Sequence, residues 1–243
     1  ESYSRAIMKA IRPITDEALA DREDMSAWMG SVLTGGPTPP RKKPRSLRRD
    51  EDVVVKLFQG LTEILGTVTS LQNIPKLASH APPKRTGVGK SAYLQLMVET
   101  YLGEVYILKE RCDRYRTAVI RMYRNDVRAA QIKERQNLLG EFTAESFRSM
   151  VDTRGGHVHV ARHDDDELAR LRTLAMLSSS SDHEGFGWIE GVAFRATKAS
   201  KVKWMNNNNK AVKRFLDEYF KEMARWVLTS GSVRFPKIVS DKS

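Results

Sequence analysis

The sequence predicts an all-α fold: an antiparallel helical bundle with long central helices, plus a short irregular or small β element near residues 182–206. Apolar side chains recur at steps of three and four residues over long stretches, which is the period of one helix face. Hydrophobic residues make up 40% of the 243 residues, and a chain of that size and composition can bury a substantial core. Segments rich in glycine and proline separate the periodic stretches and predict the connections between helices.

Two regions are expected along the chain. Residues 1–50 hold an N-terminal helix around Pro13, followed by a linker arm whose prolines and cations cannot bury apolar surface. Residues 51–243 are expected to form the helical bundle domain. The cations of the arm are candidate nucleic-acid contacts, because a basic arm attracts phosphate groups. They are Arg41, Lys42, Lys43 and Arg45.

The bundle domain is expected to begin with a helix that starts at the acidic residues 50–52 and ends near Pro75. The longest helix is predicted over residues 91–123, and its apolar stripe includes the single cysteine, Cys112. One cysteine excludes an internal disulfide, so we expect it to pack in the core. The second half of the helix carries arginines suited to phosphate contacts. The candidates are Arg111, Arg114 and Arg121.

The remaining elements are predicted from capping residues and apolar spacing. They are a helix over 127–139, a helix capped by Thr143 and interrupted by Gly155-Gly156, a helix after the acidic residues 164–167, and a C-terminal helix over about 208–228, capped from the asparagine run 206–209.

The charge distribution predicts a polyanionic partner. The net charge of +11 is uneven: residues 80–139 carry +6, residues 140–190 carry −5 and residues 191–243 carry +8. Such basic blocks favour RNA or another polyanion through counterion release and electrostatic steering. No run approaches the roughly 20 apolar residues that a membrane span needs, and residues 1–5 lack a signal-peptide pattern. We therefore expect a cytoplasmic protein without a membrane partner.

Three of the five histidines fall within residues 157–163, which is the densest group of histidines in the sequence. One hypothesis is a divalent metal held by His157, His159 and either Asp164 or Asp165, since imidazole and carboxylate are standard ligands. That site needs an extended backbone. Another interpretation is that these histidines are surface residues on a polar loop.

The hypothesis that we favour pairs Arg154 with His159 and needs no metal or other cofactor. A guanidinium presents a planar set of donors to a phosphate group. A histidine that titrates near neutral pH moves protons to or from a ribose hydroxyl. Together they suit cleavage of RNA by attack of the 2′-hydroxyl on the adjacent phosphate, with the arginine stabilising the developing charge.

This pattern, an arginine followed after four residues by a histidine at a helix junction in an all-helical bundle, resembles the HEPN superfamily of ribonucleases in toxin–antitoxin and antiviral defence systems. The resemblance covers about residues 51–180. It implies a metal-independent endoribonuclease that acts as a homodimer, with Arg154 and His159 of both copies facing a shared cleft. It also implies a partner protein such as an antitoxin or another defence component.

The chain departs from the family at Gly155, where the family usually has Asn, Asp or His directly after the arginine. His157 is the nearby residue that can take the place of that polar neighbour, so it joins the candidate catalytic residues. The alternative prediction is a non-catalytic helical protein that binds nucleic acid or regulates a partner.

Overall fold

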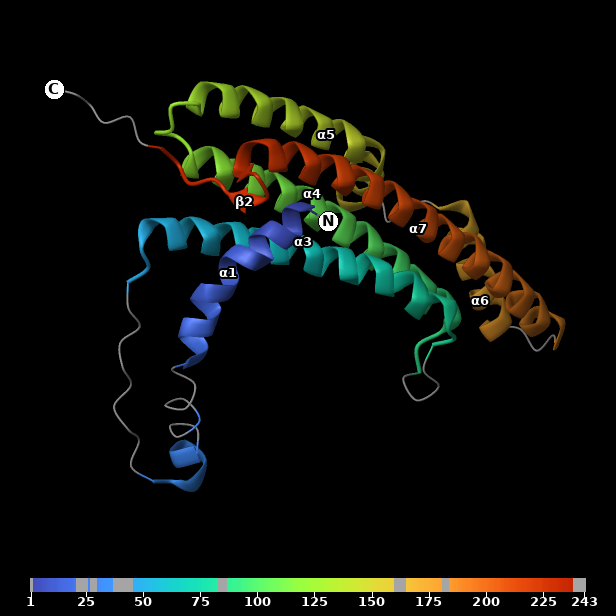
Figure 1. Ribbon diagram of the computed structural model, residues 1–243. Coiled ribbons are helices and arrows are strands. Elements are labelled where there is room, and N and C mark those ends of the chain that lie inside the picture. The colour runs from blue at the N-terminus through green and yellow to red at the C-terminus, as the bar shows by residue number, and fades with distance from the viewer. Residues whose placement is uncertain are drawn as a thin grey trace. The chain divides into compact units, whose positions relative to one another are not determined.

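The computed structural model describes residues 2–20, 26, 30–36, 46–82, 87–159, 165–180 and 184–237, with the backbone alone at residues 2, 18–20, 149–159 and 184. It confirms an all-α fold with a small β element (Figure 1). The helices are α1 (Ser2–Ala20), α3 (Arg49–Ser79), α4 (Lys90–Met122), α5 (Ala129–His159), α6 (Asp166–Ser180) and α7 (Glu184–Val227), and the strands are β1 (Leu228–Thr229) and β2 (Ser232–Val233).

The small β element lies after the last helix and not near residues 182–206. Leu228 pairs with Val233 and Thr229 with Ser232 in an antiparallel hairpin. Its two turn residues, Ser230 and Gly231, have φ of 49° and 75°, the left-handed conformation of a type I′ turn. Residues 184–206 instead form the first half of α7.

The helix runs unbroken through residues 194–212 because its buried positions have helical spacing. Phe194, Thr197, Met205 and Val212 are all buried, and steps of three, eight and seven residues keep them on one face of a helix. The glycines of residues 185–191 do not end the helix. The turns that hold these glycines are exposed or half-buried, and burial begins only at Phe194.

Three predicted helix breaks are also absent. Thr143 does not cap a helix but lies inside α5, where its buried hydroxyl donates to the carbonyl oxygen of Leu139 at 2.8 Å. The backbone stays helical through Gly155-Gly156 to His159. Pro75 lies inside α3, which continues to Ser79.

The structure confirms the predicted helix after the acidic residues and identifies Asp165 as its N-cap. Asp165 precedes α6 and accepts hydrogen bonds through Oδ1 from the backbone nitrogens of Glu167 and Leu168, each at 3.1 Å. Its other oxygen pairs with Lys201 of α7, and Lys201 also reaches Glu167 at 2.8 Å. Burial alone lowers the pKa of Lys201, but the hydrogen bonds and charges of the two carboxylates outweigh it and raise that pKa.

The chain divides into two compact units. Unit 1 comprises Glu1–Thr62, Tyr115–Gln136 and Phe220–Ser243, and unit 2 comprises Glu63–Arg114 and Asn137–Tyr219. In unit 1, Tyr3 is buried with its hydroxyl 2.6 Å from that of Tyr115, and its ring stacks on Phe220 at 5.3 Å between centroids. These contacts attach α1 to α4 and α7.

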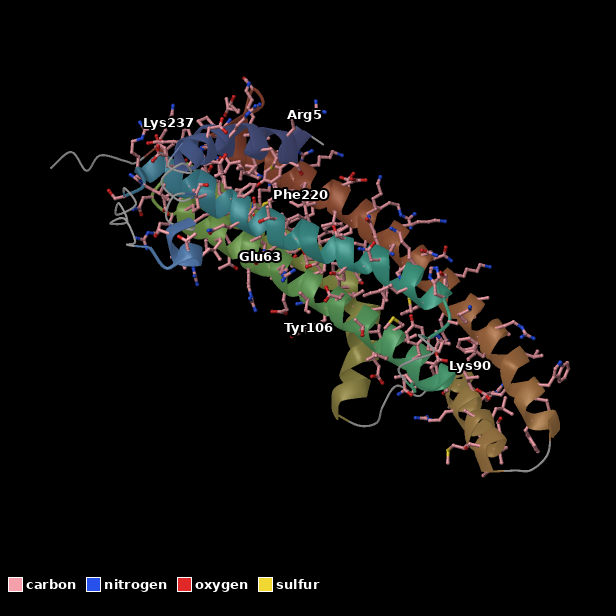
Figure 2. All side chains as sticks on the ribbon, turned by 90° about the horizontal axis from the view of Figure 1, so that it is seen from below. Arg5, Glu63, Lys90, Tyr106, Phe220 and Lys237 are labelled. Carbon is pink, nitrogen blue, oxygen red and sulfur yellow. The ribbon has the colours of Figure 1, made fainter. Side chains whose placement is uncertain are left out.

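Unit 2 holds the core of α4 and α7. The Tyr219 hydroxyl donates to the carbonyl oxygen of Cys112 at 2.7 Å, and Cys112 is fully buried, as predicted. The Tyr101 hydroxyl donates to Asn209 Oδ1 at 3.0 Å. Figure 2 shows the side chains that project from these helices, with nitrogen-tipped ones along the outer side of α7.

Candidate nucleic-acid interface

The predicted Arg154–His159 motif lies in the last turns of α5, and only its backbone is described. Successive helical residues are rotated by about 100°, so positions 154 and 159 differ by about 140° around the axis. Positions 154 and 157 differ by about 60° and share a face. The helical register therefore favours His157 over His159 as the neighbour of Arg154 along this helix.

The same register contradicts the backbone that the metal hypothesis needed. Positions 157 and 159 lie on an α-helix rather than an extended segment, and two helical positions that are two residues apart differ by about 200° around the axis. Asp165 is held by Lys201, while Asp164 and His163 lie outside the described residues. Among the residues described, no group of three His, Cys, Asp or Glu side chains forms a metal site.

The predicted nucleic-acid contacts differ in whether the structure describes them and in whether other residues already bind their side chains. Arg111 serves helix packing, because its Nη1 donates to the carbonyl oxygen of Glu63 at 2.8 Å and to the hydroxyl of Thr67. Arg114 is exposed in unit 2, and Arg121 is exposed in unit 1. The predicted contacts of the arm, Arg41, Lys42, Lys43 and Arg45, lie outside the described residues.

The most basic surface in the described part of unit 2 is on α7. Residues 195–214 contain seven lysines and arginines and no acidic residue. Five of the seven are exposed and fall within an arc of about 100° around the helix axis, opposite the buried residues Phe194 and Met205. We call this surface the α7 basic face. Its members are Arg195, Lys203, Lys210, Lys213 and Arg214.

The other two cations of this stretch have structural roles. Lys198 donates to the carbonyl oxygen of Ser79 at 2.8 Å and lies over the Phe194 ring, with Nζ 5.5 Å from the centroid. Lys201 is bound by the two carboxylates that begin α6. Both side chains point toward neighbouring elements of unit 2 and are therefore not available to a ligand.

Four members of the α7 basic face are free in the part of the chain that the structure describes. Arg195, Lys203, Lys210 and Arg214 make no side-chain hydrogen bond and no ion pair there, while Lys213 has a long, exposed ion pair with Asp217 at 3.5 Å. Exposed pairs of this kind contribute little. At about 1.5 Å per residue, the face is roughly 30 Å long.

A cavity of about 350 Å³ lies between α5 and α7 at the C-terminal end of this face. Phe142 stacks on Phe215 with centroids 5.4 Å apart and planes at 22°, and Phe147 meets Phe215 edge-on at 4.8 Å. Arg214 belongs both to the cavity wall and to the α7 basic face. The remaining lining residues are Ser146, Ala211, Val212 and Glu218.

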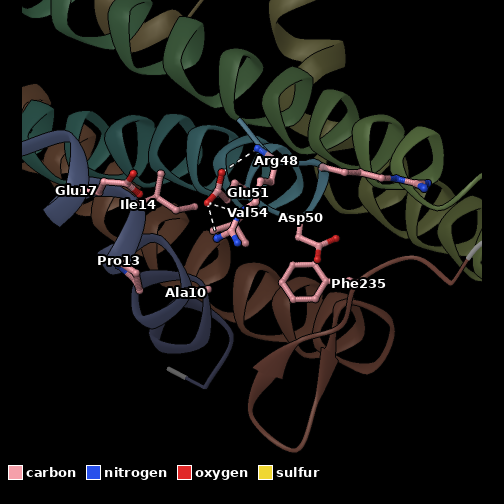
Figure 3. Close-up of a pocket in the computed structure, with 10 residues that line it drawn as sticks. Ala10, Pro13, Ile14, Glu17, Arg48, Asp50, Glu51, Val54 and Phe235 are labelled. Atoms are coloured by element: carbon pink, nitrogen blue, oxygen red, sulfur yellow. Dashed lines mark hydrogen bonds and ion pairs between the residues drawn. The ribbon is translucent and has the colours of Figure 1, made fainter. Parts of the chain in front are cut away.

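A second cavity, of about 430 Å³, lies in unit 1 between α1, the start of α3 and Phe235 (Figure 3). Its charges largely compensate one another. Arg48 donates to the buried carboxylate of Glu51 from Nε at 2.9 Å and from Nη2 and the backbone nitrogen at 2.8 Å. Glu17 and Asp50 add negative charge to the rim. This cavity is therefore a poor match for a polyanion.

Sequence reasoning missed the α7 basic face, although the charge of +8 over residues 191–243 pointed to the region. The prediction of irregular structure at 182–206 divided the face between a loop and a helix. The signal was present in the spacing: Arg195, Lys203 and Lys210 are eight and seven residues apart, or about two helical turns.

Comparison of the chain with models of protein families, with curated proteins and with solved structures finds no match. Within the described residues, no helix combines the length and apolar character that crossing a membrane requires.

Proposed function

We propose that this chain binds nucleic acid through the α7 basic face. The observation that carries the proposal is a single helix surface with four exposed cations, Arg195, Lys203, Lys210 and Arg214, that no described acidic side chain neutralises. A protein that places cations against phosphates releases condensed counterions, and this release supplies most of the affinity in binding that does not depend on base sequence.

The dimensions of the face suit this role. Duplex DNA carries one charge per about 1.7 Å of its axis, so a face roughly 30 Å long passes many phosphates. Cations at two-turn intervals reach several of them without deforming the helix that carries them. RNA and DNA both carry this phosphate backbone, so the proposal covers either nucleic acid.

The experiment measures binding of labelled RNA and DNA by fluorescence anisotropy at low salt. One variant replaces Arg195, Lys203, Lys210 and Arg214 with Gln. A matched control replaces Lys9, Arg124, Lys133 and Arg135, which are exposed cations of unit 1, and lowers the net charge equally. We expect the first variant to bind on the order of 100-fold more weakly and the control to bind nearly as the wild type does. Equal losses in the two variants would show that net charge, and not this face, is responsible.

We also propose metal-independent cleavage of RNA at Arg154, with His159 or His157 as the proton-transfer residue. This proposal is supported by the placement of the motif at the end of α5, before α6, in the unit that carries the α7 basic face. Both histidines are tested, because position 157 is nearer than position 159 to position 154 around the α5 axis.

The cleavage assay uses purified protein and RNA in EDTA. We expect Arg154→Ala to lower the rate by about 100-fold or more, and one of His157→Ala and His159→Ala to do the same. His80→Ala is the control, since His80 is an exposed histidine outside the motif. Wild-type protein that leaves RNA intact, or variants that cleave at the wild-type rate, would overturn the proposed activity without affecting the proposed binding.

A further inference from the structure

The α7 basic face ends at an aromatic cavity, and this juxtaposition distinguishes it from a merely solvated basic helix. Arg214 lines the cavity and belongs to the face, and Lys210 is one helical turn earlier on the same side of α7. A phosphate held by these two cations therefore lies at the entrance of a cavity lined by phenylalanines.

The Phe142 ring is positioned to accept another planar group. It is 41% exposed, although one of its faces is stacked on Phe215. Phe215 is in turn held by the buried Phe147 ring. Phe142 thus lines the cavity and keeps part of its ring exposed, where another planar group can pack.

We propose that this cavity takes an unpaired base, so that the α7 basic face binds single-stranded nucleic acid in preference to a duplex. The inference rests on the proposed function, since it assigns a ligand class to the same face. Nucleic-acid bases stack on aromatic side chains regardless of sequence, whereas the bases of a duplex are covered by their neighbours. The phosphate next to the inserted base then meets Arg214 and Lys210.

The size and polarity of the cavity agree with a base. Its volume of about 350 Å³ is at the lower end of the range for small-molecule sites. Ser146 and Glu218 are among its lining residues, and hydroxyl and carboxylate groups are of the kind that bond base edges. A purely apolar peptide segment gains nothing from these groups or from the adjacent cations.

The test compares Phe142→Ala with Leu138→Ala. Leu138 is one turn earlier on α5, is 48% exposed and is absent from the cavity wall. The probes are single-stranded RNA and single-stranded DNA of about 12 nucleotides and a duplex of the same sequence. Phe142→Tyr, which keeps the ring, is the rescue variant. Thermal unfolding confirms that each variant is folded.

We expect Phe142→Ala to bind single strands about 5- to 100-fold more weakly and to bind the duplex as the wild type does. Leu138→Ala and Phe142→Tyr should keep wild-type affinity for every probe. A fluorescent base analogue in the strand should lose emission with the wild type and not with Phe142→Ala.

The outcomes separate the two proposals. If wild type and Phe142→Ala bind single strands equally while the α7 basic-face variant loses affinity, the base cavity is overturned and the proposed function stands. If wild type binds no nucleic acid at low salt, the proposed function itself is overturned, and the base cavity with it.

Discussion

Asn209 of α7 donates a hydrogen bond from Nδ2 to the carbonyl oxygen of Leu71, at 2.9 Å. In an uninterrupted helix that carbonyl accepts from the backbone nitrogen four residues later. The residue there is Pro75, which lies inside α3 and has no N–H to donate. A side chain of α7 thus replaces the hydrogen bond that proline removes from α3, and α3 continues to Ser79.

Replacing Asn209 with Ala should lower the free energy of unfolding by about 1–3 kcal/mol, because the Leu71 carbonyl loses its partner. The Tyr101 hydroxyl also loses Asn209 Oδ1 as an acceptor. Urea denaturation measures the change. Asn207→Ala is the control: Asn207 is exposed, and surface substitutions of this kind usually change stability by less than about 0.5 kcal/mol.

A double-mutant cycle with Pro75→Ala isolates the relationship between Asn209 and Pro75. Alanine at position 75 restores the backbone N–H, so Asn209→Ala should cost about 0.5–1.5 kcal/mol less in that background than in the wild type. Strictly additive effects would mean that Asn209 does not compensate for the proline.

Gly60 is required by the position of the Tyr115 ring. A Cβ added at Gly60 would lie 2.2 Å from Cδ2 of Tyr115, and that ring is buried with its hydroxyl bonded to Tyr3. Gly60→Ala should therefore destabilise the protein by about 1–3 kcal/mol through overpacking. Thermal or urea unfolding checks the change.

The matched control for Gly60 is on the same helix. A Cβ at Gly66 meets nothing within 4 Å, so Gly66→Ala should leave stability unchanged or raise it by up to about 1 kcal/mol, since alanine favours helix more than glycine does. Equal effects at the two positions would show that Tyr115 moves aside.

The pH dependence of unfolding should report on Asp126. Its buried carboxylate accepts from the Arg128 side chain at 2.8 Å and from the backbone nitrogen of Lys237 at 2.9 Å. Burial alone raises the pKa of Asp126, but the hydrogen bonds and charge of Arg128 and the Lys237 N–H outweigh it, so the pKa falls from 3.8 to about 2. The folded state thus binds its proton more weakly than the unfolded state.

A lowered carboxyl pKa stabilises the folded state at pH above the unfolded value, and this contribution is lost as the pH falls from about 5 to about 2. Asp126→Asn should remove about 2 kcal/mol at neutral pH and flatten the stability profile over that range. Asp16→Asn, at an exposed position of α1, should keep the wild-type slope. An unchanged slope in Asp126→Asn would assign the acid dependence to other carboxylates.

The helical periods of the sequence predicted most of the core, because burial of one face is a local pattern. They placed Cys112 and the α4 stripe correctly. They failed at helix ends and breaks, because the deciding partners are distant in sequence: Asn209 compensates for Pro75, and no local rule anticipates a donor 134 positions away. Thr143 is a residue type that often caps helices, but its hydroxyl donates a hydrogen bond to a carbonyl oxygen of its own helix.

The candidate interface was harder to predict than the fold, because charge composition does not reveal which cations are already engaged. Lys198 and Lys201 are indistinguishable from Lys203 in the sequence, yet the first two are bound by Ser79 and by Asp165 and Glu167. Arg111 was a predicted phosphate contact, and its guanidinium instead bonds α3. Only the packing of unit 2 separates free cations from structural ones.

The salt dependence of binding gives a quantitative test of the α7 basic face. For single strands, log K falls with log salt concentration by about 0.7 per phosphate neutralised. Removing Arg195, Lys203, Lys210 and Arg214 should therefore reduce the magnitude of the slope by up to about 2.8. Anisotropy titrations over a series of salt concentrations measure it.

Phe142→Ala should behave in the opposite way in the same titrations. It removes a stacking contact and no charge, so it should lower the affinity for single strands at every salt concentration and leave the slope unchanged. A reduced slope in Phe142→Ala would mean that the ring positions the nearby cations rather than contacting a base. An unchanged slope in the four-cation variant would place the phosphate contacts elsewhere on the chain.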